Sequence, residues 1–307
     1  MRFRRRVGPA GVHFFDRDSG MNVLFDDIEP DESSWDRAPR QVSIAVTNTC
    51  DLTCPYCYAP KERANLAPDV LTEWLDELDE NGCMGIGFGG GEPTLYRHLP
   101  EICRYAKGRT GLAVTMTTHG HRLNDRLLAE LEGNLHFVRV SMDGVGATYE
   151  KLRGKPFQVL LHRLDQIGRL FSFGINFVVN RRTISDLEHA VSIAADKGAT
   201  EFLLLPEQPV GGVGGIDPTT AERLRGWVEA YEGQVPLAVS EAGAEALPTC
   251  RPLEAEAGLM AYAHVSASGD LKSSSYDTAG IRIGPEGLIA ALDELRQRLE
   301  TEEARTP

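Results

Sequence analysis

Three cysteines stand close together in the segment TNTCDLTCPYCYAP, where Cys50, Cys54 and Cys57 have the spacing C-x3-C-x2-C. Three thiolates at this spacing can hold three irons of a cubane cluster and leave the fourth iron without a protein ligand. A cluster held by four cysteines is an electron carrier. A cluster with an open iron can instead bind a small molecule and pass an electron to it, so the spacing predicts a reactive metal centre.

Other uses of cysteine fit the pattern less well. A structural zinc site takes four ligands, usually as two close pairs, and the remaining cysteines, Cys83, Cys103 and Cys250, are isolated. A disulfide framework is not expected in a chain of 307 residues with six cysteines and no secretory signal. A chance group of buried cysteines remains as the alternative, since cysteine often serves as a small core hydrophobe.

Two further motifs follow the cysteines along the chain. The segment GFGGGEPTL contains Gly89 to Pro93, and VRVSMDG contains Ser141 and Asp143 at the end of an apolar run. The cysteine run itself follows the apolar segment VSIAV. In this order and at these separations, the three motifs resemble those of the radical S-adenosylmethionine (SAM) enzymes.

The resemblance implies two cofactors, one [4Fe–4S] cluster and SAM, with Cys50, Cys54 and Cys57 as the metal ligands. The amino and carboxylate groups of SAM would chelate the open iron. An electron from the reduced cluster would then cleave SAM and release a 5′-deoxyadenosyl radical, chemistry that belongs to the cofactor more than to the protein.

The resemblance also assigns SAM contacts. The glycine-rich loop matches the segment that binds the SAM amino group, and Tyr56 matches the position that packs on the adenine. The implied SAM-binding residues are Tyr56, Gly89, Gly90, Gly91, Glu92, Pro93, Thr118, Ser141, Asp143 and Asn180. Structural alternatives stay open: a surface acid for Glu92, a helix N-cap for Ser141 or Asp143, and a core aromatic for Tyr56.

The chain from Gln41 onward alternates short β-rich runs with amphipathic helical stretches, which predicts an α/β fold with a parallel sheet. Together with the resemblance, the pattern predicts a partial (β/α)6 TIM-like barrel whose chemistry lies at the carboxyl ends of the strands. We expect strands near 42–48, 84–88, 112–117, 136–141, 174–179 and 200–205, and helices near 68–81, 97–107, 124–132, 158–170 and 185–197.

The barrel, over 41–235, is expected to carry two additions. Residues 1–40 are predicted to form a β-hairpin extension with its turn at Asp16 to Gly20, and 236–307 a small α+β extension. The latter resembles the SPASM or twitch module of peptide maturases, in which cysteines hold auxiliary clusters. Here Ser274 or a neighbouring serine takes the place of a cysteine, and hydroxyls are poor ligands for iron–sulfur centres. We therefore expect no auxiliary cluster. Cys250 is then an ordinary thiol or a hydrogen donor in the catalytic site.

Composition limits the possible partners. The net charge of −13 argues against nucleic acid, whose phosphates are bound by Lys and Arg. No apolar stretch is long enough to span a membrane, and no signal pattern is present, so a cytoplasmic protein without a membrane partner is expected. The chemistry implied would need an external one-electron reductant of the flavodoxin or ferredoxin type.

Three functions are compatible with the sequence. The first is hydrogen abstraction from a ribosomally made precursor peptide, giving a crosslink, an epimerised residue or another backbone modification; the resemblance of both flanks to peptide maturases favours it. The second is action on a small metabolite in natural-product biosynthesis, which the missing auxiliary cysteines favour. The third is a non-catalytic relative that binds SAM or a peptide.

Overall fold

The structure is a computed structural model that describes residues 3–210, 212, 214–245, 247–250 and 253–303. Its centre is a curved sheet of six parallel strands that neighbour one another in chain order. These are β4 (Gln41–Thr47), β5 (Gly85–Gly90), β6 (Ala113–Thr118), β7 (Phe137–Ser141), β8 (Phe173–Val179) and β9 (Glu201–Pro206). All six expected strands are confirmed to within a residue or two at their ends.

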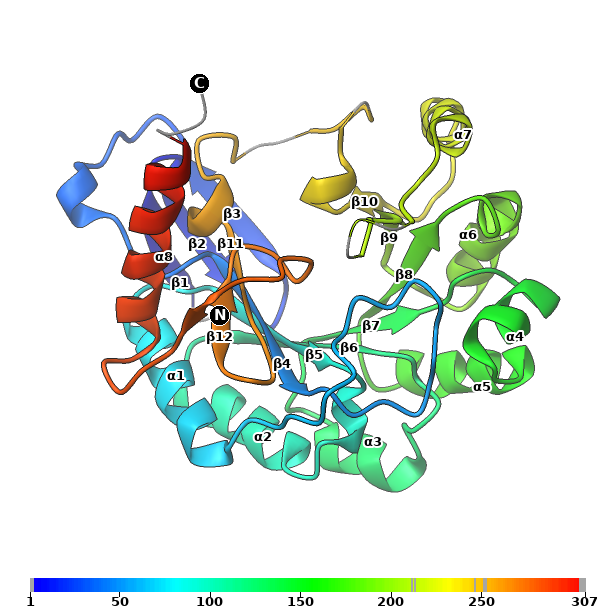
Figure 1. Ribbon diagram of the computed structural model, residues 1–307, viewed down its shortest axis with the longest axis horizontal. Helices are drawn as coiled ribbons and strands as arrows, with labels where there is room; N and C mark the ends of the chain where they lie inside the picture. The colour runs from blue at the N-terminus through cyan, green and yellow to red at the C-terminus, as the bar shows by residue number, and fades with distance from the viewer. Residues whose placement is uncertain (1–2, 211, 213, 246, 251–252, 304–307) are drawn as a thin grey trace.

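Helices form an arc around the outer face of this sheet (Figure 1). The five expected helices are present, and two more, α4 and α7, were not predicted. The set is α1 (Pro68–Glu80), α2 (Leu99–Arg109), α3 (Asp125–Leu131), α4 (Ala147–Arg153), α5 (Phe157–Gly168), α6 (Leu187–Asp196) and α7 (Pro218–Glu229). Helix α4 is only two turns long, and a pattern of that length carries little periodic signal.

The burial pattern explains why these segments pack as they do. In α1, Leu71, Trp74, Leu75 and Leu78 repeat at helical spacing and are all buried. Proline at the first position of the helix needs no hydrogen-bonded N–H there. In β5 the sequence GIGFGG alternates glycine with large apolar residues. The large residues join the core between sheet and helices, whereas the glycines leave the inner wall without side chains.

The sheet continues past the six parallel strands at both ends. Strand β10 (Leu237–Val239) pairs parallel with β9, and β11 (Tyr262–Val265) pairs parallel with β4. Strands β12 (Asp270–Lys272) and β13 (Ile281–Arg282) follow in antiparallel order, so β11 and β12 form a hairpin. The ten-stranded sheet runs from β10 to β13 and is open, a partial barrel as expected.

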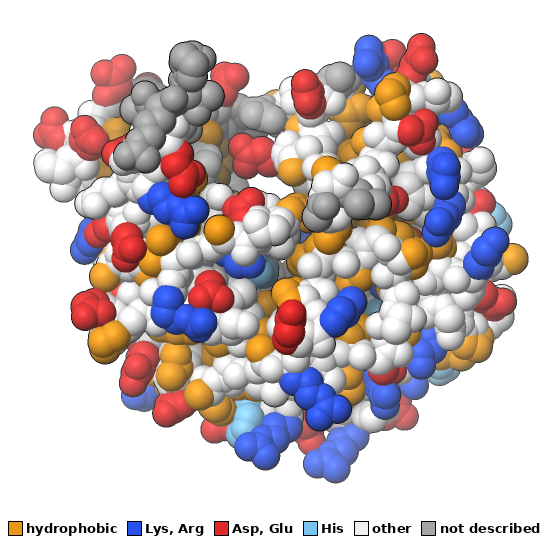
Figure 2. All heavy atoms as spheres, viewed as in Figure 1, with side chains coloured by type: hydrophobic (Ala, Val, Ile, Leu, Met, Phe, Trp, Pro, Cys, Tyr) orange, Lys and Arg blue, Asp and Glu red, His pale blue; other side chains and the backbone are white. Residues whose placement is uncertain are grey.

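Helix α8 (Leu288–Glu303) covers the β12–β13 side of the molecule beside α1. Its first N–H groups have no partner within the helix, and Glu77 of α1 supplies one. The Glu77 carboxylate accepts hydrogen bonds from the Leu288 N–H at 2.6 Å and from the Ile289 N–H at 2.9 Å. In Figure 2 the molecule is notched at its upper edge, between the part that holds α8 and the part that holds α7.

The predicted N-terminal hairpin is present, with one strand more than expected. Strands β2 (Gly11–Asp16) and β3 (Met21–Phe25) pair around the expected turn, and β1 (Arg4–Gly8) pairs with β2 on the other side. The buried Arg6 of β1 forms an ion pair with the buried Glu256, which ties this sheet to the C-terminal region. The division into 1–40, 41–235 and 236–307 stays a prediction. Within the described residues, no helix is long and apolar enough to cross a membrane.

Candidate active site

The three motif cysteines lie in the loop that follows β4, at the carboxyl end of that strand. The Cys57 N–H donates to the Cys54 carbonyl at 3.2 Å, and the Leu52 N–H donates to the Cys50 Sγ at 3.4 Å. All three thiols are half-buried and line one cavity of about 1340 Å³. Burial raises the pKa of the Cys50 and Cys54 thiols. Three soft sulfur donors that line one cavity are ligands of the type that iron–sulfur clusters use.

The glycine-rich loop after β5 packs directly on the cysteine loop. The Gly91 N–H donates to the Thr47 carbonyl at 2.7 Å, and a Cβ on Gly91 would lie 2.5 Å from the carbonyl oxygens of Asn48 and Thr49. Gly90 has φ +122°, and a Cβ there would lie 2.2 Å from the Thr47 oxygen. Two of the three glycines therefore permit contact between the loops. Only at Gly89 would a Cβ meet nothing within 4 Å, so Gly89 is the position where a ligand can approach the backbone.

Glu92 is 1% exposed, and protein donors already bond both of its oxygens. Its Oε1 accepts from the Thr118 hydroxyl at 2.6 Å and from the Thr94 N–H at 3.1 Å, and its Oε2 accepts from the His119 N–H at 2.9 Å. These bonds hold the end of β6 to the glycine loop. The surface-acid alternative for Glu92 is wrong because the carboxylate is buried. A role toward the SAM amino group stays a prediction, and Pro93 is buried outside the cavity lining.

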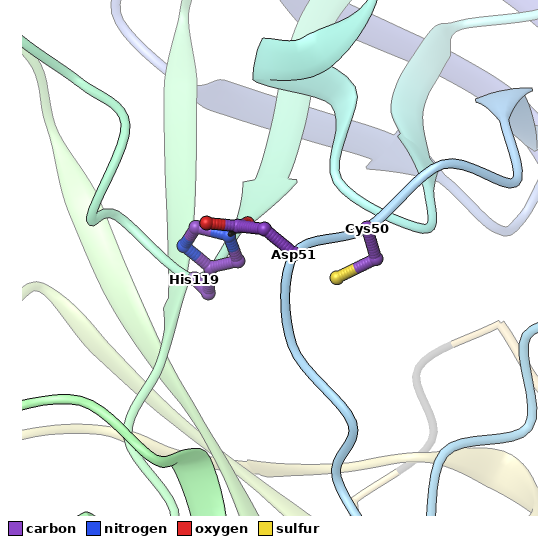
Figure 3. Close-up of side chains that lie close together, drawn as sticks. All are labelled: Cys50, Asp51 and His119. Carbon is purple, nitrogen blue, oxygen red and sulfur yellow. Dashed lines mark hydrogen bonds and ion pairs between the residues drawn. The ribbon is translucent and has the colours of Figure 1, made fainter.

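Asp51 and His119 join the cysteine loop to the end of β6 (Figure 3). The His119 Nε2 lies 2.9 Å from the Asp51 Oδ1, and Arg122 donates to the Asp51 Oδ2 at 3.0 Å. Burial raises the pKa of Asp51, but the hydrogen bond from His119 and the nearby positive charges outweigh it and lower the pKa to about 2. Cys50, Asp51 and His119 have donor atoms within 4.8 Å of one another. The sulfur is turned to the other side of the loop from the Asp51–His119 pair, so we interpret that pair as holding the loop in place.

Asp143 anchors the cysteine loop to β8 and α4. It is fully buried; its Oδ2 accepts from the Tyr56 hydroxyl at 2.7 Å and pairs with Arg153, and its Oδ1 accepts from the Val178 N–H at 2.7 Å. Burial and the Asp143 charge raise the pKa of Tyr56. Tyr56 and Arg153 line the cavity, whereas Asp143 lies behind them. The sequence alone assigned no role to Arg153, because its ion pair with Asp143 becomes visible only in the folded structure.

The remaining predicted contacts divide between cavity and core. Ser141 and Thr118 line the cavity, whereas Asn180 is buried outside the lining and its Oδ1 accepts from the Arg182 N–H at 2.8 Å. Sequence reasoning missed Asn176, which lines the cavity from β8. The sequence contained a pattern that could have identified it. Residues two apart in a strand point to the same face, so Asn176 and Val178 lie on the same face of β8.

The connection between β12 and β13, called the C-terminal hairpin below, supplies one wall of the cavity near the cysteines. Residues 273–276 line it, and the Tyr276 ring lies 5.1 Å from the Tyr58 ring. Ser274 bonds within its own turn, since its N–H donates to the Asp277 Oδ2 at 2.8 Å and its hydroxyl accepts from the Tyr276 N–H at 3.2 Å. Cys250 is exposed and absent from the cavity lining. The structure does not bring Cys250 to the site, and its role as a hydrogen donor stays a prediction without geometric support.

Comparisons with known proteins show which family and which proteins this chain is similar to. Residues 44–193 match the sequence model of the Radical SAM superfamily. The chain is 27% identical over 227 residues to the AdoMet-dependent heme synthase of Methanosarcina barkeri, a match that covers 70% of this chain and 63% of that protein. It is 30% identical over 175 residues to the PqqA peptide cyclase of Bradyrhizobium diazoefficiens, covering 52% and 44%. The chain thus spans less than two thirds of the length of these relatives.

Solved structures share the fold. The structure of SuiB from Streptococcus suis bound to the precursor peptide SuiA aligns with a TM-score of 0.74 over 94% of this chain and 87% of that one, at 13% identity. At this level of identity the likeness shows the fold alone. It covers the partial barrel together with the elements that flank it.

Proposed function

Because this chain belongs to the radical SAM superfamily, we propose that it cleaves SAM reductively and abstracts a hydrogen atom from a ribosomally made precursor peptide. The cofactors of the superfamily are a [4Fe–4S] cluster and SAM. When bound, they supply a one-electron cleavage that yields a 5′-deoxyadenosyl radical. The observation that carries the proposal is that Cys50, Cys54 and Cys57 all line one large cavity inside the barrel.

The residues of the chain would bind and orient these groups. The three thiols would hold the cluster, and the Asp51–His119 and Tyr56–Asp143 bonds would fix the loop that carries them. Gly89 leaves open space at the end of β5 for the polar end of SAM. The wall at 273–276 and the Tyr58–Tyr276 contact would limit the entry of water, which protects a radical from side reactions.

A peptide substrate is supported by two findings. One relative is named a peptide cyclase, and the SuiB structure was solved with a precursor peptide. The cavity of about 1340 Å³ exceeds the roughly 300–1,000 Å³ of ordinary ligand pockets, so it has room for SAM and part of a second molecule. The proposed electron donor is an external reductant of the flavodoxin or ferredoxin type.

The alternative is a small metabolite. The AdoMet-dependent heme synthase favours this alternative. So does the C-terminal module, where the described residues contain no second group of cysteines that could hold an auxiliary cluster. A precursor-peptide gene beside the gene for this chain would favour the peptide.

The first experiment tests the cluster itself. After anaerobic reconstitution we expect about four irons per chain, as one cubane cluster requires, and almost none when Cys50, Cys54 and Cys57 are all changed to Ala. The variant Cys250→Ala is the matched control and should keep the full iron content. Iron retained by the triple variant would contradict the assignment and indicate an auxiliary centre.

The second experiment tests the chemistry. The reconstituted protein with dithionite and SAM should form 5′-deoxyadenosine, measured by chromatography, and the triple variant should form none. Binding of SAM without its cleavage would overturn the proposed activity and favour the third possibility, a non-catalytic relative.

A further inference from the structure

A polar recess lies in the cavity wall formed by β7, β8 and β9. Arg139 of β7 pairs in register with Gly174 of β8, which pairs with Glu201 of β9. Residues paired across neighbouring strands point to the same face of the sheet, so the three form one tier of the inner wall. Because Gly174 has no side chain, Arg139 and Glu201 meet across it as an ion pair.

Asn176 adds a further polar side chain to the wall of this recess. It stands two residues beyond Gly174 on the same strand, is 8% exposed and lines the cavity. Its Oδ1 has no hydrogen-bond partner among the described residues. That oxygen has almost no accessible surface, so it lies inside the wall. Asn176 still lines the cavity, so its Nδ2 is the polar atom that faces the recess, and an amide nitrogen of this kind donates hydrogen bonds.

The charges of the recess indicate what kind of group it takes. Arg139 and Glu201 are each 29% exposed, and the guanidinium carbon of Arg139 lies 5.3 Å from the Phe137 ring centroid, which holds the side chain in place. An anion on Arg139 would face the Glu201 carboxylate, and a cation on Glu201 would face the guanidinium. An uncharged group that has both an N–H and a C=O meets neither repulsion and can bind without separating the pair.

We propose that this recess binds an amide group of the substrate, a peptide unit or a carboxamide side chain. The amide C=O accepts from a free N–H of Arg139 and from the Asn176 Nδ2, and the amide N–H donates to the Glu201 carboxylate. The inference rests on the proposed function and makes it more specific. Arg139, Asn176 and Glu201 become the residues that select an amide-bearing substrate, on the wall that also carries Ser141.

The test uses the reconstituted protein with SAM bound and a small amide as the probe. The probe is N-acetylalanine N-methylamide, and its binding is measured by saturation-transfer NMR. Its comparators are the methyl ester of N-acetylalanine, propionate and propylammonium. We expect the amide to bind best. Absence of amide binding at millimolar concentration, or tighter binding of either ion, would overturn the proposal.

Two variants locate the binding. Asn176→Leu should weaken amide binding about tenfold, the loss expected for a buried hydrogen bond. It should unfold at or above the wild-type temperature, because it removes an unbonded polar atom from the core. Glu201→Gln should shift the preference from the amide to propionate, since it leaves the Arg139 charge unbalanced. Ser43→Ala, on the β4 side of the cavity, is the control and should change neither result.

The outcomes separate this inference from the proposed function. Amide binding and SAM affinity are both measured in Asn176→Leu. A loss of SAM affinity there would overturn the inference and make Asn176 a SAM contact. Failure of the wild type to cleave SAM would contradict the proposed function. Binding of the amide probe would still test whether the recess takes an amide group.

Discussion

At the scale of single residues, the site depends on which atoms already have partners. Glu92 and Asp143 are acids that the family motif assigns to SAM, yet each is buried and bonded to several protein donors. Leaving such a carboxylate without its partners costs several kcal/mol. Asp143 lies outside the cavity lining, whereas Glu92, Gly89, Ser141 and Tyr56 are part of it, so a direct contact between Glu92 and SAM stays a prediction.

The glycines of the GGGEP segment give a residue-scale prediction. Gly91→Ala should lower the free energy of unfolding by about 1–3 kcal/mol and reduce iron content, because the new methyl group would overlap two carbonyl oxygens of the cysteine loop. Gly89→Ala should leave both unchanged and weaken SAM binding. Urea unfolding, iron analysis and calorimetry with SAM measure these effects. Equal behaviour of the two variants would contradict the separate roles.

At the scale of elements, two segments from the chain ends line the cavity of the open barrel. The turn of the N-terminal hairpin lines the cavity, and Arg17 donates to the carbonyls of Lys107, Thr110 and Leu112 at the end of α2. The C-terminal hairpin covers the cysteine side through Tyr276 and joins the sheet through β11 beside β4. The all-glycine inner row of β5 leaves space that these segments enclose.

The Tyr58–Tyr276 contact gives an element-scale prediction. Tyr276→Ala should speed the bleaching of the iron–sulfur absorbance in air several-fold, because it opens the wall beside the cysteine loop to oxygen and water. Tyr105→Phe, on the outer surface of α2, is the control and should bleach at the wild-type rate. Unchanged bleaching in Tyr276→Ala would show that the hairpin does not shield the cluster.

At the scale of the whole molecule, charge and burial set the response to pH. The surface mixes acidic and basic side chains on the face in Figure 2, whereas several histidines are buried. Burial lowers the pKa of His121, His136 and His264 to about 4, with help from positive neighbours such as Lys107 beside His136. These rings are uncharged in the folded protein and would gain protons on unfolding.

We therefore expect stability to fall as the pH drops from 6.5 toward 4, where the unfolded chain binds protons that the folded chain does not. Above pH 6.5 these histidines are uncharged in both the folded and the unfolded chain, so they do not change the free energy of unfolding with pH. The lowered pKa of Asp51 acts in a different window, since its contribution is lost only below pH 3.8. Urea midpoints across this range measure the effect, with His162→Gln at an exposed position as the control. A flat profile between pH 6.5 and 4 would contradict it.

The sequence by itself predicted most of the architecture, and its motifs indicated the cofactor chemistry through their resemblance to those of the radical SAM enzymes. The cysteine spacing, the glycine-rich segment and the alternation of strands with amphipathic helices are local patterns, so they predicted the cluster loop, the six strands and five of the helices. These patterns did not predict the short helix α4 or the third strand of the N-terminal sheet.

Only the tertiary structure decided which atoms of the motifs are available to a ligand. Gly91 meets Asn48, Asp143 meets Arg153, and Arg139 meets Glu201 across Gly174 because the register of the strands brings distant parts of the chain together. Sequence reasoning placed Cys250 in the site as a possible hydrogen donor, and the structure leaves it exposed. A motif fixes the types of residue in a loop, whereas the partner of each side chain depends on packing between strands far apart in sequence.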